Sequence, residues 1–344
     1  MKRITLGHGA GGTLTSDLVR QVFLHHFMNP YLEALSDSAV LPPGDGDSAT
    51  SLAVTTDAFV VTPIFFPGGD IGELAVFGTV NDLAVAGARP AYLTASFIIE
   101  EGFAYADLDR VAASMARAAR RAGVQVVAGD TKVVERGSCD GLFIVTSGVG
   151  RLIPGVSLSS ARVLPGDCLV INGAVGQHGA AIMCARQGED FGTSIRSDCS
   201  PLAGVLETLL VELGEGIKWL RDPTRGGLAT TVVELAESAG QCVVLEEEAV
   251  PIPDDVCGAC EMLGLDPLYL ANEGKVLIVA APEATPRLLA LLSEAGQDQA
   301  AVVGQVATSQ GMMGSWGAGA YLRTRLGGTK TLDRLTGHQM PRIC

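Results

Sequence analysis

The stretch SLAVTTDAFVVTP (51–63), followed after a short loop by IGELAVFGTVNDLAVAGA (71–88), decides the fold class. The first segment is rich in β-branched residues and predicts a strand. The second has apolar residues at helical spacing and ends in glycine, which predicts a helix. Each carries an aspartate, Asp57 or Asp82, among apolar residues. A charge in such surroundings is costly unless it is paired or coordinated.

The same alternation continues through the first half of the chain. Further strands are predicted at 90–101, 124–130 and 141–152. An amphipathic helix is predicted at 106–123, where basic residues and a glycine form the expected end. This order predicts a sheet with helices packed on one face. The segment 151–166 is rich in proline, glycine and serine and fits a domain boundary.

The second half is also mixed. Strands are predicted near 167–173, 242–246, 275–281 and 301–307, and helices near 177–187, 201–213, 226–239 and 283–295. The end, LGGTKTLDRLTGHQMPRIC (326–344), has little apolar periodicity and a Gly327-Gly328 pair, which predicts a flexible tail. The prediction is an α+β protein with an N-terminal domain at 1–153, a C-terminal domain at 154–325 and a tail at 326–344.

Composition limits the class of partner and compartment. The chain has 344 residues, 47% of them hydrophobic, which is enough for one large or two medium domains. Its net charge of −14 makes nucleic acid and membrane surfaces poor partners. No signal-peptide core is visible at the start, so the eight cysteines are expected to be reduced in the cytoplasm. The pair Cys257 and Cys260 lacks a second zinc-ligand pair; two apolar residues on a short helix explain it, with a redox pair as the alternative.

Several aspartates stand where loops meet regular elements: Asp45, Asp57, Asp82, Asp130 and Asp222. Magnesium prefers carboxylate and phosphate oxygens and needs neither histidine nor thiolate. Aspartates from separate elements therefore suggest a magnesium–nucleotide site, although each alone could cap a helix or a turn.

Glycines and two proton-transfer candidates accompany these aspartates. The loop GHGAGGTL (7–14), with Gly9, Gly11 and Gly12, could wrap backbone amides around a phosphate. It is weak evidence, because it is neither a P-loop nor a dinucleotide fingerprint. Lys132 and Glu273 could move protons, with a solvated salt bridge as the ordinary alternative.

Taken in order, the motifs resemble one superfamily over nearly the whole chain. GHGAGG, GDGDSA, TTDAFVV, GTVNDLAVAGARP, AGDTKVV, QHGAAI, DPTRGGLA and ANEGK are similar to the motifs of the aminoimidazole-ribonucleotide-synthetase-like (PurM-like) ATP-binding superfamily. Within it, the sequence most resembles the HypE family of hydrogenase-maturation proteins. The ending PRIC (341–344) is the most specific mark.

The resemblance implies a two-domain PurM-like homodimer that binds ATP and Mg²⁺ in a cleft. It implies a carrier role for the last residue, Cys344, and acid–base roles for Glu273 and Lys132. Arg342 is a weaker candidate for steadying a phosphate as the tail docks. The positions that match the Mg-ATP motifs are Asp45, Asp57, Asp82, Asp130 and Asp222, with Thr131 and the glycines Gly9, Gly11 and Gly12 as further nucleotide contacts.

The implied reaction is the ATP-dependent dehydration of an S-carbamoyl group on Cys344 to a thiocyanate, which supplies the cyanide ligand for the iron of nickel–iron hydrogenase. The implied partners are the carbamoyltransferase HypF and an iron-bearing HypC–HypD complex. Two alternatives remain open at this point. A small-molecule kinase or ligase of the same superfamily would leave Cys344 idle, and a non-catalytic one-carbon carrier would never hydrolyse ATP.

Overall fold

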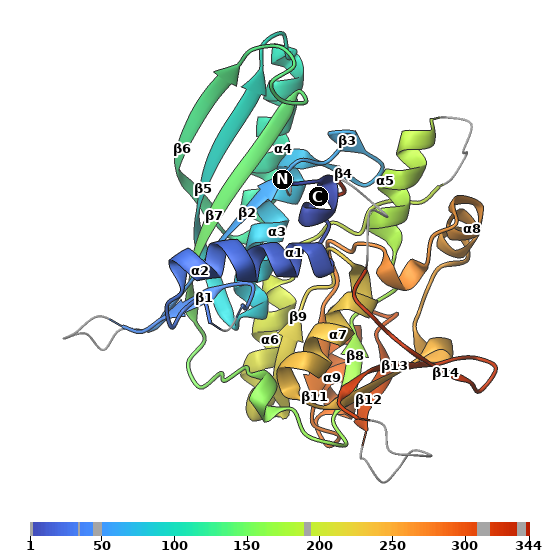
Figure 1. The fold of residues 1–344 in the computed structure, drawn as a ribbon. Helices are drawn as coiled ribbons and strands as arrows, with labels where there is room; N and C mark the ends of the chain where they lie inside the picture. The colour runs from blue at the N-terminus through green and yellow to red at the C-terminus, as the bar shows by residue number, and fades with distance from the viewer. Residues whose placement is uncertain (1–2, 34, 44–49, 189–193, 308–316, 336–341) are drawn as a thin grey trace.

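Two mixed sheets, each with its own helices, form the two domains of the protein (Figure 1). The computed structural model describes residues 3–33, 35–43, 50–188, 194–307, 317–335 and 342–344. The predicted two-domain α+β fold is confirmed. Among the described residues, no helix is both long and apolar enough to cross a membrane.

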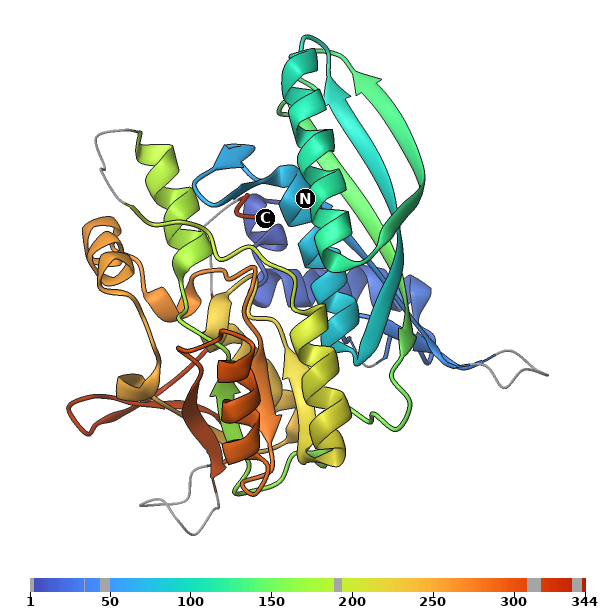
Figure 2. The same ribbon diagram turned by 180° about the vertical axis from the view of Figure 1, so that it is seen from behind.

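The N-terminal sheet has the strand order β1-β2-β7-β5-β6, and only β5 and β6 run parallel. Its strands are β1 (Ala39–Leu41), β2 (Leu52–Phe59), β5 (Ala88–Glu100), β6 (Gln125–Val134) and β7 (Leu142–Leu152). Helices α3 (Ile71–Val85) and α4 (Tyr105–Ala122) cover one face (Figure 2). This arrangement confirms the prediction of helices on one face of a sheet.

Alternation along β7 shows how this sheet is layered. Leu142, Ile144 and Thr146 are buried toward α3, while the residues between them are partly exposed on the other face. Helix α3 is buried on almost every side, because it lies between the sheet, α4 and helix α6 (Ala203–Leu213) of the C-terminal domain. The aspartate on this helix, Asp82, is therefore held where the two domains meet.

Shorter elements complete the N-terminal domain. They are η1 (Leu6–Gly9), α1 (Thr13–Leu18), the π-helical turn η2 (Val19–Phe23), α2 (Leu24–Phe27) and the small hairpin of β3 (Phe65–Phe66) and β4 (Gly69–Asp70). These elements and β1 are not among those predicted from the sequence. α1, η2 and α2 follow one another without a gap, so they form one helical segment from Thr13 to Phe27.

The C-terminal sheet has the strand order β14-β13-β10-β12-β8-β11-β9. Its strands are β8 (Cys168–Ile171), β9 (Ile217–Arg221), β10 (Cys242–Glu246), β11 (Leu277–Ala280), β12 (Ala301–Ala307), β13 (Gly319–Arg323) and β14 (Thr329–Thr331). The remaining helical elements are η3 (Ser160–Arg162), α5 (Gln177–Gln187), η5 (Gly214–Gly216), α7 (Gly227–Ala239), η6 (Glu247–Ala249), α8 (Asp254–Leu263), η7 (Pro267–Tyr269) and α9 (Thr285–Glu294). The helices and strands predicted for this half are all present.

Both faces of this sheet are covered. Leu277 and Val279 of β11 pack in the same cluster as the apolar side of α7. Ile278 and Ala280, which point the opposite way, pack with α6 and α9. Burial on both faces explains the continuous apolar runs of the central strands.

The prediction of a tail without regular structure from residue 326 is wrong in part. Strand β14 pairs antiparallel with β13, and the connection passes through Gly327, whose φ is +81°. The N–H of Thr324 donates to the oxygen of Gly328 at 2.8 Å, which closes the turn. The Gly327-Gly328 pair therefore marks a hairpin turn and not the start of a linker.

Candidate active site

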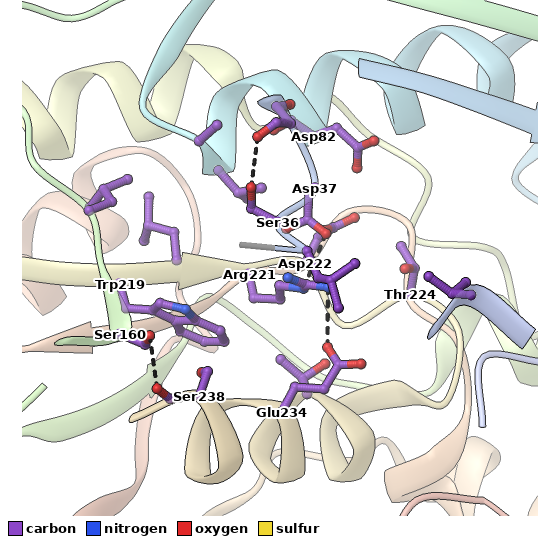
Figure 3. Close-up of a pocket in the computed structure, with 18 of the residues that line it drawn as sticks. Ser36, Asp37, Asp82, Ser160, Trp219, Arg221, Asp222, Thr224, Glu234 and Ser238 are labelled. Atoms are coloured by element: carbon purple, nitrogen blue, oxygen red, sulfur yellow. Dashed lines mark hydrogen bonds and ion pairs between the residues drawn. The ribbon is translucent and has the colours of Figure 1, made fainter. Parts of the chain in front are cut away.

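A cavity of about 840 Å³ lies where the two domains meet. The N-terminal domain contributes Asp37 and Asp82, and the C-terminal domain contributes Trp219, Arg221 and Asp222. Figure 3 shows the three aspartates at one end of this cavity and Trp219 at the other. Strand β9 positions this second group, because it runs along the cavity and ends at Arg221.

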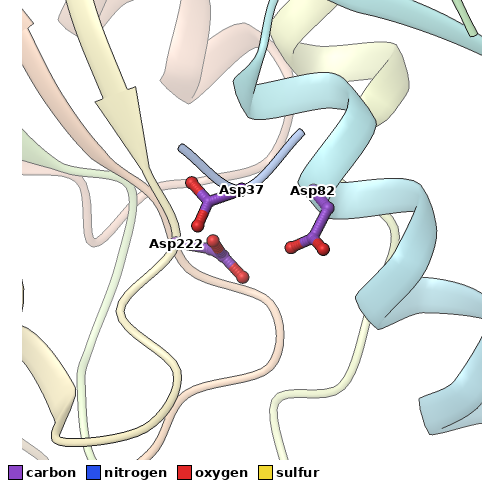
Figure 4. Close-up of side chains that lie close together, drawn as sticks. All are labelled: Asp37, Asp82 and Asp222. Carbon is purple, nitrogen blue, oxygen red and sulfur yellow. The ribbon is translucent and has the colours of Figure 1, made fainter. Parts of the chain in front are cut away.

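Three carboxylates converge at one end of the cavity. Asp37 precedes β1, Asp82 lies on α3 and Asp222 follows β9 (Figure 4). One carboxylate oxygen from each lies within 4.8 Å of the other two. Arg221 Nε lies 3.1 Å from Asp37 Oδ1, and Asp82 Oδ2 accepts a 2.8 Å hydrogen bond from Thr55.

The pKa of each of these carboxylates is raised above its ordinary value. Burial is the largest cause at all three positions. For Asp82 the charges of Asp222 and Asp37 add to it, and the pKa rises well above its ordinary value. For Asp222 burial and the charge of Asp37 raise the pKa to about 7. The cluster therefore has more negative charge than Arg221 alone can balance.

These residues fit a bound divalent cation. Carboxylate oxygens from separate elements are the ligands that Mg²⁺ prefers, and a cation would lower the pKa of all three aspartates. The cavity beside them is large enough for a nucleotide. Of the aspartates predicted from the sequence, Asp82 and Asp222 belong to this cluster.

Asp57 lines the same cavity but has a different partner. Arg225 Nη2 lies 3.3 Å from Asp57 Oδ1. Gly11, also in the cavity wall, has a φ of +80°, and a Cβ at this position would lie 2.8 Å from the Cβ of Arg225. The glycine loop therefore packs directly on Arg225.

The last residues of the chain are docked beside this arginine. The N–H of Val60 donates to the backbone oxygen of Cys344 at 3.1 Å, and the N–H of Thr62 donates to that of Arg342 at 3.3 Å. His178 Nε2 lies 2.9 Å from the backbone oxygen of Ile343. Cys344 is only 8% exposed, and it packs in the apolar cluster that includes Phe59.

Two charged side chains lie against the Cys344 thiol. The positive charge of Arg225 favours the thiolate form of Cys344, and the negative charge of Glu273 disfavours it. Burial raises the pKa of the Cys344 thiol to about 12, although Arg225 acts in the opposite direction. Burial, reinforced by Asp222 and Asp57, raises the pKa of Glu273 well above its ordinary range. One oxygen of this carboxylate, Glu273 Oε1, is buried without a hydrogen-bond partner among the described residues.

Asp130, Thr131 and Lys132 do not join this site within one chain. They lie on the edge strand β6, where every residue but the last is exposed. Lys132 Nζ lies 2.6 Å from Asp130 Oδ2, and the N–H of Thr131 donates to Asp130 Oδ1 at 2.9 Å. None of the three is among the described residues that line the cavity. Asp45 lies outside the described residues.

Arg342 is placed differently from its predicted role at a phosphate. Its Nε donates to the backbone oxygen of Val60 at 3.0 Å, its guanidinium pairs with Asp140, and it lies over the ring of Phe143. Arg342 therefore holds the end of the chain against the N-terminal sheet. The prediction of a phosphate contact is wrong for this docked arrangement, because the side chain binds N-terminal-domain groups that lie outside the cavity wall.

The other glycines and the cysteine pair have structural positions. A Cβ at Gly12 would collide with the backbone oxygen of Leu335, whereas one at Gly9 would meet nothing within 4 Å. Gly11 is therefore the member of this loop that lines the cavity. Cys257 and Cys260 lie on α8, and no group of candidate metal ligands among the described residues includes them.

Asp37 and Arg225 are among the site residues that are not predicted from the sequence. Asp37 stands in ALSDSAVL between two serines, a context typical of a turn, and only the pairing of β1 with β2 places it near Asp82. Arg225 is part of the DPTRGG motif, so a signal for it was present. Its partner Cys344 lies far along the chain, and only the fold brings the two together.

Known proteins resemble the chain over its whole length. Residues 35–152 match the family "AIR synthase related protein, N-terminal domain", and residues 165–316 match its C-terminal counterpart. The carbamoyl dehydratase HypE of Rhodobacter capsulatus is 48% identical, with 100% of this chain and 98% of the relative covered.

Two solved structures are similar in fold and sequence. A structure of the hydrogenase maturation protein HypE in complex with ATP has a TM-score of 0.82 and 45% identity, covering 99% of this chain and 100% of that one. A HypE–HypF complex has a TM-score of 0.84 and 44% identity, covering 92% and 99%. These findings confirm the resemblance found in the sequence: the chain belongs to the HypE family of carbamoyl dehydratases.

Proposed function

We propose that this chain catalyses the ATP-dependent dehydration of an S-carbamoyl group on Cys344 to a thiocyanate, the source of the cyanide ligand for nickel–iron hydrogenase. One observation carries the proposal: the Cys344 thiol is buried against Glu273 and Arg225, and Arg225 also lines the cavity of the three aspartates. A small-molecule kinase would have no use for a thiol at this position. The names of the relatives support the same reaction.

Asp37, Asp82 and Asp222 would hold Mg²⁺, and the cavity beside them would hold ATP. The bound ATP supplies a γ-phosphoryl group, which converts the carbamoyl oxygen from a poor leaving group into part of a phosphate that leaves readily. The three carboxylates would position the charge of the metal beside the phosphoryl group that is transferred. ATP binding by the relative of known structure supports this assignment.

Glu273 would take the first proton from the carbamoyl nitrogen. Its raised pKa makes the ionised carboxylate a stronger base, and its unpartnered oxygen Oε1 is available to a nitrogen donor. The reaction needs two such proton removals to form the carbon–nitrogen triple bond. The apolar cluster around Cys344 excludes water, which would otherwise hydrolyse the activated group.

Partners and subunits follow from the same proposal. A HypE–HypF complex among the similar structures supports HypF as the carbamoyl donor of this chain. The acceptor would be the HypC–HypD iron complex, in the cytoplasm, where the cysteines stay reduced. We also propose a homodimer through the N-terminal sheet, in which Asp130, Thr131 and Lys132 serve the cavity of the second subunit. Their position on an exposed edge strand suits such a role.

The test is the mass of the C-terminal peptide from protein carbamoylated at Cys344 and incubated with Mg-ATP. Loss of one water that requires ATP is the expected result. Cys257→Ala is the matched control, because this cysteine lies on α8 away from the cavity lining, and it should behave as the unaltered protein. An unchanged carbamoyl mass with active ATP hydrolysis would favour the small-molecule kinase, and no change in either would favour the carrier.

A further inference from the structure

We propose that Arg225 is a further catalytic residue of the dehydration, one that binds the carbamoyl oxygen on Cys344 and turns it toward the nucleotide cavity. This inference rests on the proposed function of the site. It is drawn from the position of Arg225 between two otherwise separate parts of the molecule: the buried end of the chain and the cavity that holds the three aspartates.

The Arg225 side chain faces both parts. Arg225 lines the cavity, where its Nη2 pairs with Asp57 Oδ1 at 3.3 Å, and its positive charge acts on the buried thiol of Cys344. Gly11 packs closely on the Cβ of Arg225, where a larger residue would have no room. Any group attached to the Cys344 sulfur lies one bond farther out, and so within reach of the same guanidinium.

Hydrogen-bonding chemistry then sets the orientation of a carbamoyl group. A guanidinium only donates hydrogen bonds, so it can bind the carbamoyl oxygen but not the amide nitrogen. An ionised carboxylate only accepts, so Glu273 can bind the nitrogen but not the oxygen. The buried oxygen Glu273 Oε1 has no other partner among the described residues. Arg225 and Glu273 together admit one orientation, with oxygen toward the cavity and nitrogen toward the base.

The reaction can be written in full for this orientation. The carbamoyl oxygen attacks the γ-phosphorus of ATP, an O–P bond forms, and ADP leaves with the electron pair of the broken P–O bond. The nitrogen gives one proton to Glu273 as a C=N bond forms. The C–O bond then breaks with its electron pair on phosphate, the departing phosphate takes the second nitrogen proton, and S–C≡N remains. Arg225 stabilises the charge that develops on the oxygen during both steps.

The experiment compares Arg225→Gln and Arg225→Lys with the unaltered protein, each carbamoylated at Cys344 with an ¹⁸O label in the carbamoyl group. We expect Arg225→Gln to slow the ATP-dependent loss of water by about a hundredfold or more, with a matching loss of ¹⁸O transfer to phosphate. Arg225→Lys should retain more activity, because one charged donor remains. Arg89→Gln is the control, since that arginine forms an exposed pair with Glu207 and should change neither quantity.

A second measurement separates this role from nucleotide binding and from folding. Nucleotide affinity is compared between Cys344→Ala and the double variant Cys344→Ala/Arg225→Gln, and we expect equal values. A loss of affinity as large as the loss of rate would overturn the inference, because Arg225 would then serve the nucleotide. Water loss within about threefold of the unaltered rate in a folded Arg225→Gln would overturn it as well. If the unaltered protein itself loses no water with ATP, the proposed function fails, which is a different result.

Discussion

The ring nitrogen Nε2 of His178 lies 2.9 Å from the backbone oxygen of Ile343, across 165 positions of sequence. The other ring nitrogen lies 2.8 Å from Ser197 Oγ, which accepts a hydrogen bond from the N–H of Cys199. Because the Ser197 hydroxyl oxygen accepts from Cys199, its own proton can be donated to Nδ1 of His178. The ring proton is then on Nε2, which donates a hydrogen bond to the backbone oxygen of Ile343. The fully buried His178 therefore holds the residue before Cys344 in its docked position.

Replacing His178 should release the end of the chain without unfolding the protein. His178→Ala removes the donor to Ile343 and leaves a buried oxygen unsatisfied, at a cost of about 1–3 kcal/mol. We expect iodoacetamide to alkylate Cys344 faster in this variant, as measured by the mass of the C-terminal peptide. His178→Gln keeps an N–H donor and should preserve most of the protection. Equal alkylation rates in all three proteins would show that His178 does not hold the tail.

The reactivity of Cys344 should depend on pH in a specific direction. Burial raises the thiol pKa from 9.0 to about 12, so the docked thiol at pH 8 carries about a thousandfold less thiolate than an exposed cysteine. Because the folded pKa lies above the unfolded value, this group contributes stability that is present below pH 9 and is lost as the pH rises toward 12.

Urea unfolding from about pH 7 to about pH 10 checks this effect. We expect the difference in unfolding free energy between the unaltered protein and Cys344→Ala to stay constant below about pH 8 and to shrink above about pH 9. Cys168→Ala is a matched control, because its partly buried thiol lies in the C-terminal sheet away from the cavity. A difference that grows with pH would contradict the burial of an un-ionised thiol.

Asp82→Asn should weaken Mg²⁺-dependent ATP binding and should stabilise the metal-free protein. Loss of one hard oxygen ligand should weaken ATP binding in the presence of Mg²⁺ by about ten- to a hundredfold, and should leave binding without Mg²⁺ unchanged. In the metal-free protein the change removes a like charge beside Asp222 and Asp37, so stability at about pH 8 should rise.

Calorimetric titration and thermal unfolding measure these two effects of Asp82→Asn. Asp109→Asn, on the exposed side of α4, is the control and should change neither. Equal nucleotide affinity with and without Mg²⁺ in Asp82→Asn and the unaltered protein would remove Asp82 from the metal site.

Two glycines of one loop should differ sharply when replaced. Gly12→Ala places a methyl group against the backbone oxygen of Leu335, so the loop or the start of the tail must shift, at a cost of about 1–3 kcal/mol. Gly9→Ala meets nothing within 4 Å and should be close to neutral. Thermal unfolding compares the two variants. Similar melting temperatures would mean that the loop does not pack on the tail.

The regular elements that were predicted are long enough to show their own period. The strand at 51–63 and the helix at 71–88 correspond to β2 and α3, and the aspartate on each was identified as costly. Asp82 was predicted because a charge among apolar residues needs a partner, and Asp222 because it stands where a loop meets a regular element. These signals are local, and a single sequence contains them.

The rest of the site depends on contacts between distant parts of the chain. Asp37 stands just before a three-residue strand, and nothing near it in the sequence shows that Asp82 and Asp222 lie beside it. The docking of residues 342–344 uses mainly backbone oxygens, which every residue has, so no side-chain pattern could reveal it. Asp130 and Lys132 resembled cluster members in sequence, yet the exposed edge strand holds them apart from it.

Glu273 and Lys132 should prove to be partners from different subunits. Glu273 lies beside Cys344 of its own chain, so Glu273→Gln should slow nitrile formation by about two to four orders of magnitude. Lys132 lies on an exposed edge strand, so Lys132→Ala should also inactivate the homodimer, through the neighbouring site.

When the two inactive variants are unfolded, mixed and refolded, half of the sites in each mixed dimer carry neither change, and about a quarter of the full activity should return. Lys330→Ala is the control, because this lysine on β14 forms an exposed pair with Asp266 and its loss removes the same charge, so the variant should stay active. Full activity of Lys132→Ala alone would show that this lysine takes no part, and two inactive variants that fail to complement would mean that each site takes both residues from the same chain.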